Sequence, residues 1–304
     1  MSENSENKGI ILENALLRHV IPFRHSELSF KQFNLFIGKN GSGKSNLFKL
    51  LSRNYGTSTP IEKDPDVELS FSDESVIKLE QNSQDIYQFI SLDKPYQKNS
   101  IFFPEVTTIT QRIQPSSAFS QMEPFTKLEY DDDLMNEINK KLSLLFGREI
   151  QIRSIEQRGR VPFYKKNGVY INPDNDGTGI KTSFPLIELL LFQKNTMIFV
   201  EEPTAFLHPS IIPDYLKIIF ELTTLGNNQL FMTTHEILTS LQFFKGIYEK
   251  NPNISIHRFE DNFGEINITS IDQDNVTGSL DEFLGNFPFP KDIKQLQDMS
   301  GWYP

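Results

Sequence analysis

The chain has 304 residues, 38% of them hydrophobic, which suffices for one large domain or two small ones and excludes disorder throughout. It contains no cysteine, which excludes disulfides and thiolate metal sites and fits a cytosolic protein. The formal net charge of −10 argues against a chain that coats nucleic acid through bulk charge, but it does not exclude a local basic groove.

The N-terminal third is predicted to consist mainly of short strands. Residues 1–8 are polar and are expected to form a disordered tail. Leu17–His25 is expected to be an irregular connection, whose side chains either flank a nucleotide base or belong to a solvated loop. Strands are expected at Ile10–Leu12, Glu27–Phe30, Asp66–Phe71, Ser75–Leu79, Asp85–Leu92 and Ser100–Ile109. These strands predict a lid-like antiparallel sheet around a nucleotide site.

One stretch in this third, Phe33–Leu51, carries a specific motif. An apolar strand is followed by a glycine-rich loop and then by apolar residues at helical spacing, and the loop fits G-x-x-x-x-G-K-[ST] without a mismatch. Glycines let successive backbone N–H groups point into one concavity, which together with the helix N-terminus attracts phosphate. An ordinary glycine turn is the alternative. The predicted nucleotide-binding residues are Gly38, Lys39, Asn40, Gly41, Ser42, Gly43, Lys44, Ser45 and Asn46.

Within the motif, two side chains have predicted roles. Lys44 would reach the β- and γ-phosphates of a nucleoside triphosphate, and Ser45 would offer its hydroxyl to Mg²⁺.

The rest of the chain predicts a loop, then helices alternating with strands. Gln111–Thr126 is expected to be a loop. Helices are expected at Asp131–Phe146, Ile180–Phe192, Ile211–Leu225 and Glu236–Phe244. Strands are expected at Glu149–Ile155, Val161–Lys165, Val169–Ile171, Thr196–Val200 and Gln229–Met232, and a hairpin is expected from Ile254–Phe259 and Glu265–Ile271. The strand–helix alternation from residue 180 onward indicates an α/β core with a parallel sheet.

Two of these strands end in polar side chains. Thr196–Val200 is followed by Glu201 and Glu202, of which the first is predicted to hold the metal and the second to orient and deprotonate the attacking water. A solvated acidic turn is the alternative. After the next strand, His235 is predicted to contact the γ-phosphate or the water. His208 either begins the helix at Ile211 or lines a subunit contact.

The order of these motifs resembles the ABC-type ATPases. A P-loop, a Gly loop before a helix, strand-Glu-Glu-Pro, Leu-His-Pro and strand-Thr-Thr-His occur in that order across residues 9–245. The chain looks most like the soluble branch of chromosome-maintenance and RecF-like heads, overcoming-lysogenization-defect nucleases and small AAA-annotated ATPases of bacterial anti-phage defence. Glu-Glu-Pro is similar to that branch, whereas transporters commonly have Asp-Glu-Pro.

The resemblance implies an ATP-dependent homodimer, or higher oligomer, with ATP and Mg²⁺ between subunits. The trans signature loop would correspond to Gly177, Thr178 and Gly179, although no LSGGQ is present. The phosphate-sensing Gln has only weak candidates, Gln111 and Gln114. Relatives carry coiled-coil arms at about 130–172, where the short segment of this chain leaves no room for them.

The resemblance also sets the expected domains and architecture. We expect a P-loop NTPase of the α/β class, an ABC-ATPase head with a parallel core sheet, an antiparallel β subdomain and no coiled-coil arms. The ATPase domain would span 9–245 with a short helical and β insertion at about 127–172, and residues 246–304 would form a hairpin and tail packed on the same domain. The longest apolar runs are too short to span a bilayer, and the polar start lacks a signal-peptide core, which predicts a cytoplasmic protein without membrane contact.

Two further segments carry charge. Arg148–Lys166 contains six basic residues against two acidic ones, a local charge of +4, so it either contacts nucleic acid or an acidic partner, or protects a solvated strand edge. Asp272 and Asp274 resemble a nuclease metal pair, but too little chain surrounds them for a nuclease domain.

The motifs therefore predict a slow ATPase, converting ATP and water to ADP and phosphate. It would act as a nucleotide-gated dimeric switch, sensor or motor subunit in phage defence or DNA maintenance, with a separate effector such as a nuclease. The alternatives are a non-hydrolysing ATP-dependent scaffold and, with less support, a transporter nucleotide-binding subunit.

Overall fold

The computed structural model describes 12 segments of the chain, and every structural statement below concerns these residues. They are 11–20, 22–23, 25–39, 41–52, 66–81, 87–91, 100–103, 132–155, 159–171, 178–234, 253–262 and 264–271. The predicted loop at Gln111–Thr126 and the predicted helix at Glu236–Phe244 lie outside them.

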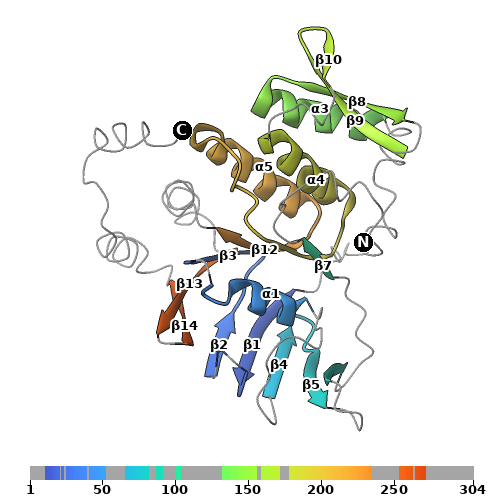
Figure 1. The fold of residues 1–304 in the computed structure, drawn as a ribbon. Coiled ribbons are helices and arrows are strands. Elements are labelled where there is room, and N and C mark those ends of the chain that lie inside the picture. The colour runs from blue at the N-terminus through green and yellow to red at the C-terminus, as the bar shows by residue number, and fades with distance from the viewer. Residues whose placement is uncertain are drawn as a thin grey trace, which may run out of the picture.

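A mixed six-stranded sheet forms the centre of the molecule (Figure 1). Five of its strands are parallel and β14 is antiparallel to β13 at one edge. The spatial order is β14 (Glu265–Ile271), β13 (Ile254–Asn262), β3 (Phe33–Gly38), β12 (Gln229–Thr234), β11 (Met197–Val200) and β7 (Ser100–Phe103). Both β11 and β12 are buried at every position, as expected for parallel strands covered on both faces.

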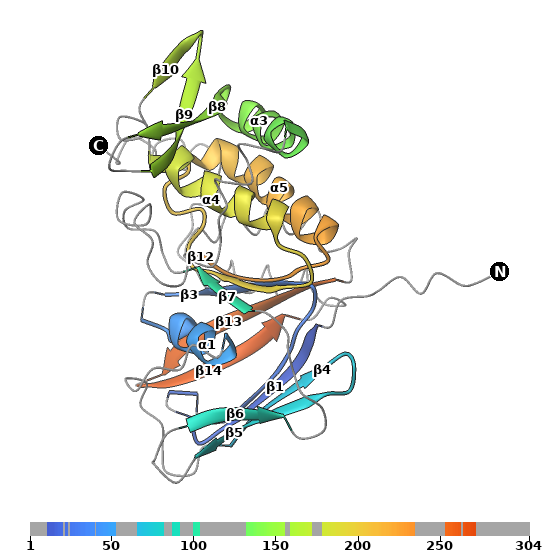
Figure 2. The same ribbon diagram turned by 90° about the vertical axis from the view of Figure 1, so that its right-hand side faces the viewer.

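An antiparallel sheet of five strands packs below one face of the core sheet, together with α1 (Lys44–Leu51) (Figure 2). Its order is β2 (His25–Ser29), β1 (Leu12–Arg18), β4 (Asp66–Phe71), β5 (Val76–Gln81) and β6 (Tyr87–Ser91). The side chain of Gln229 links the two sheets, since its amide donates to Leu12 O at 2.7 Å and accepts from Leu12 N at 2.8 Å. The antiparallel β subdomain predicted from the sequence is therefore present beside the P-loop helix.

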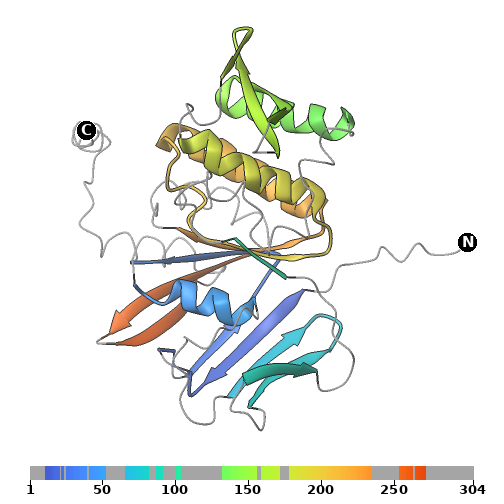
Figure 3. The ribbon, with the colours of Figure 1, turned by 45° about the vertical axis from the view of Figure 1, so that its right-hand side comes forward.

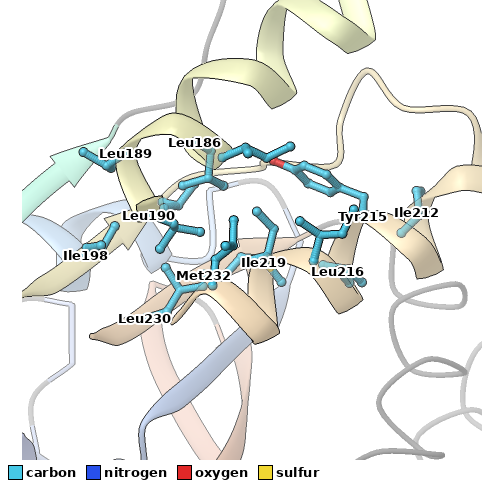
Figure 4. Close-up of a cluster of buried hydrophobic side chains, with 14 of the residues drawn as sticks. Leu186, Leu189, Leu190, Ile198, Ile212, Tyr215, Leu216, Ile219, Leu230 and Met232 are labelled. Atoms are coloured by element: carbon cyan, nitrogen blue, oxygen red, sulfur yellow. The ribbon is translucent and has the colours of Figure 1, made fainter. Parts of the chain in front are cut away.

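Two helices, α4 (Thr178–Phe192) and α5 (Ile212–Leu225), cover the opposite face of the core sheet (Figure 3). Their apolar side chains meet those of β11 and β12, as Leu190, Ile219 and Met232 illustrate in Figure 4. Beyond them lie α3 (Asp132–Phe146) and the small sheet of β8 (Glu149–Ile155), β9 (Gly159–Lys166) and β10 (Val169–Ile171). The longest helices in the described segments, α3 and α4, have 15 residues each, so these segments contain no coiled-coil arm.

Two predicted elements differ from the structure. The strand expected at Ser100–Ile109 was assigned to the antiparallel sheet, but β7 pairs in parallel with β11 in the core sheet. Leu17–His25 was predicted to be an irregular connection, but β1 continues to Arg18, which pairs with His25 at the start of β2. A register shift between Leu12 and Asn14 interrupts the alternation of buried and exposed residues at the start of β1.

Among the helices of the described residues, none is both long and apolar enough to cross a bilayer.

Candidate functional site

The predicted phosphate-binding loop connects β3 to α1. Gly41 and Gly43 have φ values of 78° and 84°, a left-handed conformation that glycine adopts without strain. At Gly38 a Cβ atom would lie 2.7 Å from Phe259 O and 2.8 Å from Ser42 Oγ, so a side chain has no room there. The sequence therefore places glycine where the backbone turns left-handed or is closely approached, as a phosphate nest requires.

Lys44 lies at the first position of α1 with its ammonium turned back over the loop. Its Nζ donates to Gly38 O at 2.7 Å and to Lys39 O at 2.9 Å, and the residue is only 6% exposed. Burial lowers the pKa of the ammonium, while the carboxylates of Glu202 and Glu201 oppose that shift. The ammonium of the loop and the two acids after β11 therefore lie close enough to interact electrostatically.

A chain of aromatic rings fixes these elements relative to one another. Phe36 of β3 contacts Phe48 of α1, with ring centroids 5.3 Å apart, and Phe48 meets Phe199 of β11 edge-on at 5.5 Å. Phe199 in turn stacks on Phe231 of β12 at 4.5 Å. Because such buried ring contacts have preferred geometries, they hold the strand, the helix and the acid-bearing strand in one arrangement.

The acidic pair follows β11 at the carboxyl end of the sheet. Glu202 is 9% exposed and adopts a left-handed φ of 46°, and its backbone N–H donates to Thr233 Oγ1 at 3.1 Å. The hydroxyls of Thr204 and Thr234 are hydrogen-bonded at 3.2 Å. The turn that carries the acids is therefore anchored to the end of β12. Sequence reasoning assigned no role to these threonines, although their place at a strand end beside the acids was a usable signal.

The predicted signature residues Thr178 and Gly179 open α4. A Cβ atom at Gly179 would lie 2.9 Å from Phe206 O, so the start of α4 packs closely against the segment after Glu202. Phe206 itself is exposed. The start of α4 and the acid-bearing turn are thus neighbours in one chain.

The other predicted residues occupy varied positions. Lys39, Gly41 and Ser45 are exposed, Asn46 is half-buried and Ser42 is buried. His208 caps the short 3₁₀ helix Pro209–Ile211 that leads into α5, because its Nδ1 accepts from Ser210 N at 3.2 Å. This confirms its role at the start of the helix. Asn40, Gly177, His235, Gln111, Gln114, Asp272 and Asp274 lie outside the described residues.

The basic segment Arg148–Lys166 covers β8 and β9. Lys165 lies opposite Glu149 in the strand pair, and their side chains form an ion pair at 3.4 Å, with Lys166 exposed beside the turn. This pairing occurs at the surface, where ion pairs contribute little to stability. Contact between the segment Arg148–Lys166 and nucleic acid stays a prediction.

Residues near Lys44 also offer the type of oxygen ligand that a magnesium ion requires. Ser45 offers a hydroxyl oxygen and Glu201 a carboxylate oxygen, and the latter is among the charges that act on Lys44. Oxygen ligands from one or two carboxylates or hydroxyls, completed by phosphate and water, are what Mg²⁺ prefers.

One protein family matches part of the chain. A family model described as "AAA domain, putative AbiEii toxin, Type IV TA system" matches residues 91–241, a span that includes both acids. No curated protein matches the chain.

Solved structures match over most of the chain. An SMC head bound to the C-winged helix domain of ScpA is 14% identical, with a TM-score of 0.63 over 88% of this chain and 99% of that one. The SMC head domain from Thermotoga maritima is 16% identical, with a TM-score of 0.55 over 86% and 99%. The recombination mediator RecF with ATP is 12% identical, with a TM-score of 0.51 over 88% and 100%.

The chain therefore has the fold of an ABC-type ATPase, as its motifs predicted. Among ABC-type folds, its fold is similar to those of the SMC heads and RecF.

Proposed function

We propose that the chain binds ATP between the loop Gly38–Ser45 and the acids Glu201 and Glu202, and hydrolyses it slowly. The observation that carries this proposal is the position of Lys44, whose ammonium lies in the glycine loop and within electrostatic reach of both carboxylates. A solvated acidic turn, the alternative reading of the pair, is disfavoured because Glu202 is buried and anchored to β12.

The residues divide the chemistry among them. Backbone N–H groups of the loop and Lys44 hold the phosphates, so the terminal phosphoryl group is positioned and its developing charge is offset. Glu202 accepts a proton from the attacking water, with His235 as a second contact to the water or the γ-phosphate. Ser45 and Glu201 would hold Mg²⁺, which when bound neutralises phosphate charge.

The functional unit is an ATP-gated homodimer. The residues Gly177, Thr178 and Gly179 of one copy would face the loop Gly38–Ser45 of the other, so that ATP joins the subunits and hydrolysis releases them. An exposed apolar residue supports this dimer. Phe206 lies beside Gly179 at the start of α4, and its large side chain is at the surface.

The chain would serve as a sensor or motor subunit in phage defence or DNA maintenance, with a separate effector. The matching family is described as containing a putative toxin of a toxin–antitoxin system, which supports a role in phage defence. The similarity in fold to SMC heads and RecF supports a role in DNA maintenance. We place the ATPase domain at 9–245 and the molecule in the cytoplasm.

Phosphate release by the purified chain with ATP and Mg²⁺ tests the proposal. We expect slow turnover in the wild type, loss of nucleotide binding in Lys44→Ala, and retained binding with a roughly 10²- to 10⁴-fold lower rate in Glu202→Gln. Lys217→Ala, an exposed lysine on α5, is the matched control and should behave as wild type. Absence of turnover in the wild type, or full turnover in Glu202→Gln, would contradict hydrolysis and favour a non-hydrolysing scaffold.

A further inference from the structure

The carboxyl end of β12 lies directly beside the turn that carries the acids. Val200, the last residue of β11, pairs with Met232, so Thr233 stands one position beyond the last pair of these two strands. On its other side Thr233 pairs with Phe36 of β3, two residues before the glycine loop begins. Thr233 therefore sits between the strand that leads into the phosphate loop and the turn that carries Glu202, and it is only 2% exposed.

The hydroxyl of Thr233 makes a specific contact there. Its Oγ1 accepts the backbone N–H of Glu202 at 3.1 Å, a buried hydrogen bond between residues 31 positions apart in the sequence. A valine has the same shape but could not accept this hydrogen bond. The backbone N–H of Glu202 would then lose the hydroxyl acceptor that it has in the wild type.

The backbone that this bond holds is strained. Glu202 has a φ of 46°, a left-handed conformation that costs free energy for any residue with a Cβ atom. Such a conformation persists only where its surroundings fix it, and it sets the direction in which the side chain leaves the backbone. A second contact, from Ala205 N to Glu202 O at 3.2 Å, closes the turn on the other side.

We propose that Thr233 is a positioning residue for Glu202: its hydroxyl holds the Glu202 backbone in the left-handed conformation that directs the carboxylate toward the attacking water. This inference rests on the proposed ATPase function and names how that site keeps its geometry. In this proposal Thr233 acts on the reaction through Glu202, whose backbone N–H its hydroxyl accepts. Displacement of a general base by a fraction of its hydrogen-bond length lowers the rate without changing how the nucleotide is held.

Steady-state kinetics of Thr233→Val test this role. We expect kcat to fall roughly 10- to 100-fold, with KM and the Kd for a fluorescent ATP analogue within about threefold of wild type. Thr233→Ser keeps the hydroxyl and should recover most of kcat. Thr223→Val is the matched control, because it removes an equally buried hydroxyl whose bond, to Ile219 O at 2.7 Å, lies within α5. The control should leave kcat unchanged.

Four outcomes would overturn the inference. If the wild type hydrolyses ATP and Thr233→Val has the same kcat, the positioning role of Thr233 is wrong, while the proposed ATPase function stands. Equal losses of kcat and nucleotide binding in Thr233→Val, or no recovery in Thr233→Ser, show that the residue supports folding rather than Glu202. A wild-type chain that releases no phosphate overturns the proposed function and this inference together.

Discussion

Three residues with left-handed backbone conformations lie at the candidate site. Gly41 and Gly43 in the loop have φ values of 78° and 84°, and Glu202 after β11 has 46°. For glycine this conformation is free of Cβ strain, whereas for glutamate it costs free energy that the surroundings must offset. The two glycines differ in their surroundings, because Gly41 has open space where a Cβ would be and Gly43 does not. Their substitution therefore separates backbone strain from steric exclusion.

We predict that Gly43→Ala destabilises the protein more than Gly41→Ala. Alanine costs about 1–2 kcal/mol at either position because φ is positive. At Gly43 the new Cβ would also overlap with Ile266 Cδ1 and lie 3.3 Å from Phe23 Cε1, which adds an overpacking cost of roughly 1–3 kcal/mol. Urea denaturation without nucleotide measures both variants. Equal losses of stability would show that Ile266 and Phe23 move aside freely.

Among the elements, α4 carries an unusual residue on its buried face. Glu188 is 2% exposed, and its Oε1 has no hydrogen-bond partner among the described residues. Burial raises the pKa of its carboxyl well above the ordinary value of 4.5. Tyr164 of β9 is also buried, and its pKa is raised by burial and by the nearby Glu188. The helix layer and the small sheet therefore meet at a site that favours a neutral, protonated carboxyl.

We predict that Glu188→Gln flattens the pH dependence of stability. Above pH 4.5 the unfolded chain releases the Glu188 proton, whereas the folded chain retains it. The stability contributed by the protonated carboxyl is therefore fully present below about pH 4.5 and is lost as the pH rises toward the pKa in the folded chain. The free-energy difference between variant and wild type should therefore grow with pH, by at most about 1.4 kcal/mol per unit.

Urea denaturation at pH 5 and pH 8 measures this difference. Glu27→Gln, an exposed carboxyl on β2, is the matched control and should show no such trend. A constant offset between Glu188→Gln and wild type over this range would mean that the carboxyl is ionised or hydrated in the folded chain.

Most of the helices and strands were predictable from the sequence, and the exceptions have physical causes. The P-loop strand and helix, α3, β11 and α5 follow from apolar periodicity and glycine stops in the sequence. The pairing partner of β7 did not, because a four-residue strand with three apolar residues fits either sheet, and the choice depends on contacts far along the chain. The contact between Thr233 and Glu202 was hidden for the same reason, whereas the glycine loop was readable because its function depends on local backbone geometry.

For the whole molecule, one sheet separates two cores. One core joins the antiparallel sheet and α1 to the sheet, and the other joins α4 and α5 to its opposite face (Figures 1 and 2). The glycine loop and the acids lie at the carboxyl ends of β3 and β11, and the start of α4 packs on the segment that follows the acids. Binding of a second copy across ATP would thus use residues on both sides of the sheet.

Phe206 provides the test of that assembly, since it is 43% exposed beside the start of α4. We predict that Glu202→Gln with ATP and Mg²⁺ forms a dimer of twice the 35.1 kDa chain mass and that ADP does not support it. Adding Phe206→Ser should return the species to the monomer mass, because burial of a phenylalanine contributes roughly 1.5–3 kcal/mol. Light scattering after gel filtration measures the mass.

The matched control adds Leu225→Ser, which removes an exposed apolar side chain at the end of α5 and should leave the dimer intact. Phe206→Ser should also unfold close to the temperature of the parent variant, because Phe206 is an exposed residue outside both cores. A dimer that persists in Phe206→Ser would place the interface elsewhere. A Glu202→Gln chain that stays monomeric with bound ATP would contradict the ATP-gated dimer itself while leaving nucleotide binding at Gly38–Ser45 untouched.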